Sequence, residues 1–109
     1  MIGKGGVDLV SGGGDNWTQV TAAAVIKANP GRVCKLSVIA PGSTSGAFTF
    51  NDCTTTGAAA SGNQIFTMAY NAAANAAGAV ITLEWPCQFG IVCSAVPGGG
   101  SPIINVSWV

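Results

Sequence analysis

The chain has 109 residues, enough for one small domain, with four basic and four acidic side chains and a formal net charge of zero. Charged residues make up 7% of the sequence, whereas an average soluble domain has about 25%. The neutral balance argues against nucleic acid as a partner, because phosphate binding requires a basic face.

Residues 1–15 form a glycine-rich segment, which we expect to be a flexible N-terminal arm that precedes a single domain of residues 16–109. After its first two residues, the apolar side chains of the arm are those of Val7, Leu9 and Val10. The arm is either a disordered tail or a segment that becomes ordered on a neighbouring subunit. In the second case Val7, Leu9 and Val10 would bind that neighbour.

Seven strand-like runs separated by turn signals follow the arm, and their pattern is typical of a sandwich or barrel. Apolar and polar residues alternate in several of them, as at Phe48 and Phe50, which predicts one buried face and one exposed face. The sequence therefore predicts an all-β fold, a single small β-sandwich or jelly-roll-like domain. The runs are 16–28, 32–40, 46–53, 63–71, 79–85, 89–96 and 103–109.

Two connecting segments have a recognisable chemistry. The sequence Asn-Pro-Gly-Arg at 29–32 predicts a type II turn, in which Pro30 presets φ and Gly31 supplies a positive φ. The alanine-rich segment 69–79 has high helix propensity but no apolar stripe, so we expect a loop with about one helical turn.

The four cysteines, Cys34, Cys53, Cys87 and Cys93, show no closely spaced pair, and the chain has no histidine. Buried free thiols in a reducing compartment are the expected state. One or two disulfides in the released protein, or a four-thiolate zinc site, are the alternatives. We therefore expect no metal and no other cofactor.

The absence of histidine excludes a Ser-His-Asp triad and a Cys-His pair. The acidic residues are scattered, and only an Asp52–Glu84 carboxylate pair is conceivable for glycoside hydrolysis. We therefore expect a protein that is not an enzyme. No apolar run approaches the roughly 20 residues that span a bilayer, and no secretory signal is recognisable, so we expect synthesis in a cytoplasm and no membrane partner.

Three tryptophans could make contacts with a partner or with sugar rings. Trp85 and Trp108 follow the aliphatic positions of their strands, which favours packing in the core or in a subunit interface. Trp17, at the start of the first run, is the better candidate for an exposed contact.

Lys27, Arg32 and Lys35 are three of the four basic residues, and they surround one turn. We expect Arg32, with Lys27 and Lys35, to make polar contacts to a partner subunit. The alternative is that Arg32 pairs locally with Asp52 or lies free in solvent.

The sequence "IKANPGRV" at 26–33, the run "GAFTFNDC", and the ending "FGIVCSAVPGGGSPIINVSWV" resemble a group of small bacteriophage virion structural proteins. The resemblance covers about residues 20–109 and carries no catalytic residues. It implies a capsid decoration (cement) protein with a β-sandwich or jelly-roll module, which binds the major capsid protein and assembles as a homodimer or homotrimer on the capsid surface.

Two other functions remain open at this point. The chain could be a tail, neck or head-fibre component of the virion, or a carbohydrate-binding module for attachment to a host surface. A single basic cluster on a neutral body would orient a decoration protein on an acidic capsid with little nonspecific nucleic-acid binding.

Overall fold

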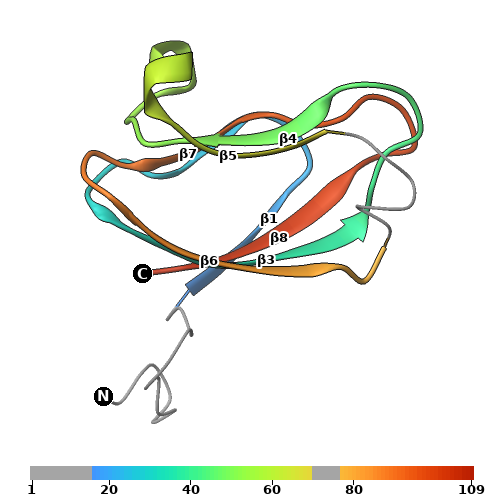
Figure 1. Cartoon of the computed structure of the whole chain (residues 1–109), viewed down its shortest axis with the longest axis horizontal. Coiled ribbons are helices and arrows are strands. Elements are labelled where there is room, and N and C mark those ends of the chain that lie inside the picture. Colours follow the sequence, from blue (N-terminus) through green and yellow to red (C-terminus); the bar gives the residue numbers. More distant parts are fainter. Residues whose placement is uncertain (1–15, 70–76) are drawn as a thin grey trace, which may run out of the picture.

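The computed structural model describes residues 16–69 and 77–109, and these residues form two antiparallel four-stranded sheets packed face to face (Figure 1). The all-β sandwich predicted from the sequence is therefore confirmed. The strands are β1 (Asn16–Val20), β2 (Ala24–Lys27), β3 (Gly31–Ala40), β4 (Ala47–Asn51), β5 (Gln64–Ala69), β6 (Val80–Cys87), β7 (Ile91–Ala95) and β8 (Ile103–Trp108).

One sheet has the strand order β1-β8-β3-β6 and the other has the order β2-β7-β4-β5. The chain folds as a long hairpin in which β1 pairs with β8, β2 with β7, β3 with β6 and β4 with β5. This hairpin is then rolled up, so that β8 also pairs with β3 and β7 with β4. Eight strands connected in this way form a jelly roll.

The prediction of seven strands is wrong at one place. The first run, 16–28, contains two strands, because the chain passes from one sheet to the other at Thr21–Ala23. No glycine or proline marks this corner. The segment between β4 and β5 forms two short 3-10 helices, η2 (Thr56–Ala58) and η3 (Ser61–Asn63), which Figure 1 shows above the second sheet.

The core lies between the two sheets and consists of the inward-facing residues of the alternating strands. Phe48 and Phe50 of β4 are fully buried, as are Ile104 and Val106 of β8, in agreement with the alternation in the sequence. Phe50 also makes an edge-to-face contact with Phe66 of β5, with 6.1 Å between the ring centroids.

The turn at 29–32 differs from the type II prediction, because Gly31 is not among the glycines with positive φ. Glycine is required there for a different reason. A Cβ on Gly31 would lie 2.3 Å from the carbonyl oxygen of Val109. The residue therefore allows the start of β3 to approach the end of β8 closely.

Trp85 was predicted to pack in the core or in a subunit interface; it does not pack in the core, and the interface placement stays a prediction. Its side chain is 49% exposed. Glu84 has a positive φ of 51°, which interrupts the period-two alternation of β6 just before Trp85. Trp108 does pack against the core cluster, as expected.

Candidate docking face

The outer face of the β1-β8-β3-β6 sheet carries two of the residues that the sequence predicted as partner contacts. Trp17 of β1 lies opposite Ser107 of β8, and Ser107 lies opposite Lys35 of β3. Directly opposed residues of paired strands point to the same side of a sheet. The Trp17 side chain is 67% exposed, so it is available for a contact.

A hollow of about 290 Å³ lies between Trp17 and Lys35 and is lined also by Ser37, Asn105, Val106 and Ser107. Two of its polar side chains, Asn105 and Ser107, are held in place by hydrogen bonds. Gln19 Nε2 donates to Asn105 Oδ1 at 3.3 Å, and the backbone N–H of Lys35 donates to Ser107 Oγ at 2.9 Å. The hollow thus combines one exposed indole, one cation and a fixed set of hydroxyl and amide groups.

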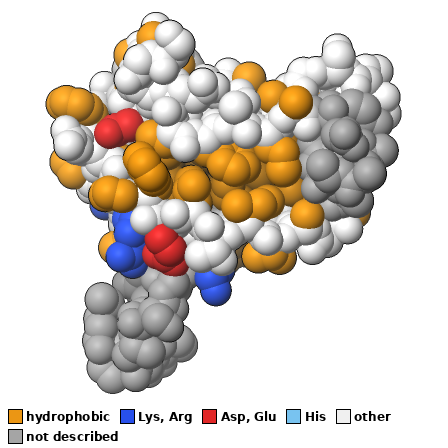
Figure 2. Space-filling model, in the orientation of Figure 1, with side chains coloured by type: hydrophobic (Ala, Val, Ile, Leu, Met, Phe, Trp, Pro, Cys, Tyr) orange, Lys and Arg blue, Asp and Glu red, His pale blue; other side chains and the backbone are white. Residues whose placement is uncertain are grey.

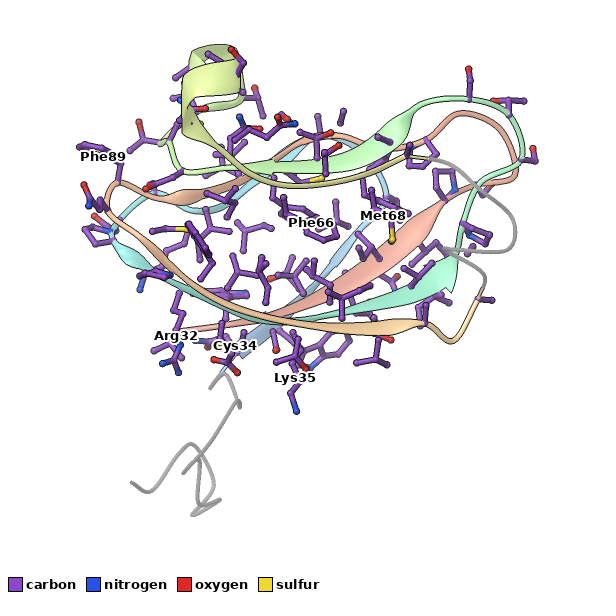
Figure 3. All side chains as sticks on the ribbon, viewed as in Figure 1. Arg32, Cys34, Lys35, Phe66, Met68 and Phe89 are labelled. Atoms are coloured by element: carbon purple, nitrogen blue, oxygen red, sulfur yellow. The ribbon has the colours of Figure 1, made fainter. Side chains whose placement is uncertain are left out.

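A β-bulge explains how Arg32 and Lys35, three positions apart, come to the same face. Val33 pairs with Trp108 and Lys35 with Ser107, so that Cys34 is an extra residue in β3. In a regular strand, positions 32 and 35 would point to opposite faces. Figure 3 shows Arg32, Cys34 and Lys35 on the side of the sheet away from the core.

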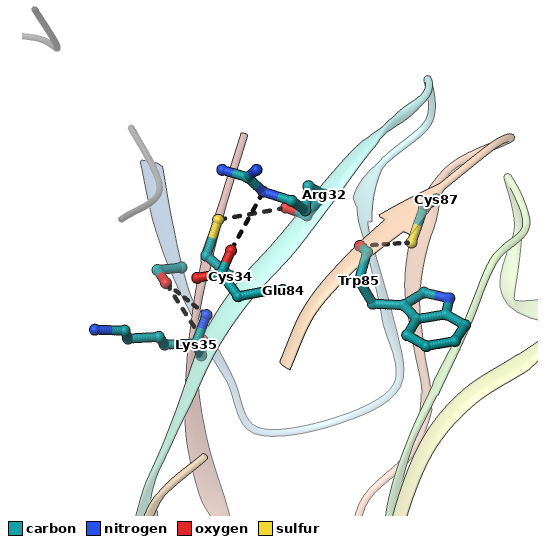
Figure 4. A network of polar contacts seen from close by, with 7 residues as sticks. Arg32, Cys34, Lys35, Glu84, Trp85 and Cys87 are labelled. Carbon is teal, nitrogen blue, oxygen red and sulfur yellow. Dashed lines mark hydrogen bonds and ion pairs between the residues drawn. The ribbon is translucent and has the colours of Figure 1, made fainter. Parts of the chain in front are cut away.

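Arg32 has a partner in the neighbouring strand. Its Nε lies 3.5 Å from Glu84 Oε1, and both side chains are partly exposed, at 44% and 31% (Figure 4). The predicted alternative of an Arg32–Asp52 pair is therefore wrong. The second oxygen, Glu84 Oε2, is buried without a hydrogen-bond partner. Glu84 orients one edge of the guanidinium, which also lies beside the Cys34 thiol and stays partly exposed.

Lys27 lies on β2 in the other sheet, with its Nζ 5.8 Å from the centroid of the Trp108 ring, a cation–π distance. A second hollow, of about 340 Å³, is lined by Lys27, Pro30, Gly31, Arg32 and Val109. The structure therefore places Lys27 beside Arg32 at the end of the sandwich, whereas Lys35 lies beside Trp17. Val7, Leu9 and Val10 lie outside the described residues.

Asp52 supports the turn between β6 and β7. Its carboxylate accepts the backbone N–H groups of Gln88 at 2.8 Å, Phe89 at 2.8 Å and Gly90 at 3.2 Å. Burial alone would raise the pKa of Asp52, but these three hydrogen bonds outweigh burial and lower it. Asp52 binds this turn and Glu84 binds Arg32, so the two carboxylates have separate structural roles.

The four cysteines are free and buried, which is the state expected from the sequence. Burial is the main cause that raises the pKa of Cys87 to about 11, with smaller contributions from Asp52 and Cys53. Burial likewise raises the pKa of Cys93 to about 11. Within residues 16–69 and 77–109, no three Cys, Asp or Glu side chains gather as metal ligands.

Sequence reasoning missed the polar residues Asn105 and Ser107 on the face that carries Trp17 and Lys35, and it missed the partner of Arg32. The signal for Asn105 and Ser107 was present, since they alternate with buried Ile104 and Val106 on β8. Glu84 lies 52 positions from Arg32 in the sequence, and no local pattern connects the two residues.

A third hollow, of about 410 Å³ and with a polar lining, lies between the outer face of β4, β5 and β7 and the segment that contains η2 and η3. At its base the buried Asn51 donates to the Ala60 carbonyl and to Asn63 Oδ1, and Ser94 Oγ donates to Asn51 Oδ1. Each polar group of Asn51 is therefore satisfied, and the network attaches the 3-10 segment to the sheet.

No protein family model, curated protein or solved structure matches this chain. Among the described residues, no helix has the length and apolar character needed to cross a membrane.

Proposed function

We propose that this chain is a capsid decoration protein, which binds the outer surface of a phage capsid and bridges neighbouring major capsid protein subunits. The observation that carries the proposal is the common placement of Trp17, Lys35 and Arg32 on one sheet face. The jelly roll, a fold that virion proteins use widely, supports it as well.

The proposed protein acts by covering surface and not by chemistry. Because it binds the assembled shell and not the separate capsid subunits, its binding energy adds to the stability of the shell. Trp17 supplies the apolar centre of the contact, since exposed tryptophans are frequent energetic centres of interfaces. Arg32 and Lys35 orient the neutral body on an acidic capsid surface and increase the association rate.

Co-sedimentation with empty capsid shells tests the proposal. We expect saturable binding at a fixed ratio to capsid subunits, with at least about a 30-fold loss of affinity for Trp17→Ala. Val25→Ala is the control, because Val25 is an exposed apolar residue on β2 of the other sheet and does not lie on this face. Arg32→Glu should weaken binding most at low salt. Equal binding by Trp17→Ala and wild type would refute docking through this face.

A carbohydrate-binding function is the second candidate, and the hollow beside Trp17 favours it. A solvent-exposed indole next to hydroxyl and amide groups can stack on a sugar ring and bind its hydroxyls. Titration with host-surface glycans, followed by tryptophan fluorescence in wild type and Trp17→Phe, distinguishes the two functions. Glycan binding without capsid binding would replace the decoration role, and absence of both would favour a tail, neck or head-fibre component.

A further inference from the structure

One side of the sandwich is open between the edge strands β5 and β6. These strands end their respective sheets and do not pair with each other. A hollow of about 340 Å³ at one end of this side is lined by Gln64 and Ile65 of β5, Trp85 of β6 and Phe89 of the following turn. The two strands therefore face each other across a gap, and each has an outer edge with backbone groups that could pair with another strand.

The hollow itself is also lined by Asp52, Asn63 and Gln88, but away from it the gap is lined by apolar side chains. Phe66 and Met68 of β5 and Ile81 and Leu83 of β6 pack against the core but are only partly buried. Figure 3 shows Phe66 and Met68 between the sheets, and Figure 2 shows a continuous hydrophobic band at the positions of β5 and β6. At its margins Val80 is 63% exposed, Trp85 49% and Phe89 61%. A band of this kind marks a contact site in a soluble protein.

The edge of β6 is open to a partner strand only in its first half. Glu84, with its positive φ, and Pro86 interrupt the second half, and both features hinder strand addition. Val80–Leu83 remain as a regular stretch of four residues without a charged side chain.

We propose that this side is the acceptor for Val7–Val10 from the N-terminal arm of a second copy of the chain. The added segment would pair with the edge of β6 at Val80–Leu83 and insert Val7 and Leu9 between Leu83 and Met68, with Asp8 directed to solvent. The segment Val7–Val10 has the same length as the regular stretch Val80–Leu83, and its apolar residues Val7 and Leu9 alternate with the two-residue period of a strand.

The position of the arm in the fold favours a second copy over the same copy. The arm joins the sheet at β1, and β8 and β3 separate β1 from β6. To reach its own β6, the arm would cross about 14 Å of sheet, over the face that holds Trp17 and Lys35. Only residues 11–15 would link the inserted segment to β1, and five residues span at most about 18 Å, so a path to the same copy's β6 edge would need an almost fully extended linker. The inference requires no capsid, so it can fail independently of the decoration role.

Photo-cross-linking in the full chain tests the proposal directly. Leu9 is replaced by p-benzoylphenylalanine, equal amounts of ¹⁴N- and ¹⁵N-labelled protein are mixed and irradiated, and the cross-linked peptides are identified by mass spectrometry. We expect cross-links that join a light and a heavy chain, with the acceptor in Gln64–Ala69 or Val80–Leu83. Cross-links within single chains, cross-links to the Trp17 face, or no cross-links would overturn the proposal.

Sedimentation equilibrium adds a second measurement. Leu9→Asp and Leu83→Asp should each lower the self-association constant at least about 10-fold, because each places a carboxylate in the apolar gap. Val25→Asp is the control, since Val25 is exposed on β2, away from β5 and β6. Leu9 precedes β1 in the sequence, so Leu9→Asp keeps the test valid if Leu83→Asp does not fold. Unchanged association of Leu9→Asp would also overturn the proposal.

Discussion

Asp52→Asn isolates the carboxylate that supports the β6–β7 turn. In the native protein, Oδ1 accepts the N–H groups of Phe89 and Gly90, and Oδ2 accepts that of Gln88. Asparagine keeps one acceptor oxygen, but its amide nitrogen replaces the other and faces an N–H donor. We therefore expect a folded but less stable protein.

The size of the effect follows from the exposure of the three donors. Gln88 and Phe89 are exposed, so water can replace part of their hydrogen bonding, whereas Gly90 is buried. Hydrogen bonds to a charged group contribute about 1.5–3 kcal/mol each and those to a neutral group about 1 kcal/mol. Loss of one bond and of the charge on the other two would cost at least about 2.5 kcal/mol at full strength, and the exposure of Gln88 and Phe89 lowers the expected decrease in the free energy of unfolding to about 2 kcal/mol. The melting temperature should fall by about 10 °C.

The substitution should also change the pH dependence of stability. The pKa of Asp52 is lowered from 3.8 in the folded protein, so the carboxylate stabilises the fold above that pH. This contribution is lost as the pH falls from 3.8 through the folded-state pKa. The difference in stability between wild type and Asp52→Asn should therefore be constant near neutral pH and decrease in acid.

Urea unfolding, monitored by tryptophan fluorescence at pH values from neutral to acidic, measures both effects. The difference between the two proteins removes the contributions of the other carboxylates, which are common to both. Equal stabilities at neutral pH, or a difference that grows in acid, would refute the role assigned to Asp52.

Three further predictions test the packing. Gly31→Ala should lower the free energy of unfolding in urea by about 1–3 kcal/mol, because its Cβ would lie 2.3 Å from the Val109 carbonyl oxygen. Gly57→Ala is the control, since no atom lies within 4 Å of its Cβ, and its stability should stay within about 0.5 kcal/mol of wild type. Equal losses of stability in the two variants would contradict this account. The native protein should react slowly with Ellman's reagent at pH 8 and release four thiols when denatured, because all four cysteines are buried. Arg32→Ala should accelerate the reaction of one thiol, Cys34, which lies beside the Arg32–Glu84 pair; an unchanged rate would show that this pair does not shield it.

The strands and their buried faces could largely be predicted from local patterns. Alternation at Phe48 and Phe50 depends only on the two-residue period of a strand, and both side chains are in the core. Trp17 was predicted to be exposed because it stands at the start of a strand, and it is exposed. The core placement that was one prediction for Trp85 is wrong, because the positive φ of Glu84 changes the alternation and no residue type announces it.

By itself the sequence determined an all-β sandwich of low charge, with its cysteines buried and its basic residues around one turn. The tertiary structure decided how these parts meet. The bulge at Cys34 is present in the pairing of β3 with both β6 and β8, and it is this bulge that brings Arg32 and Lys35 to one face. The partner of Arg32 and the open β5–β6 side likewise depend on strands distant in sequence, whose pairing is set by the packing of the whole sheet and leaves no local pattern.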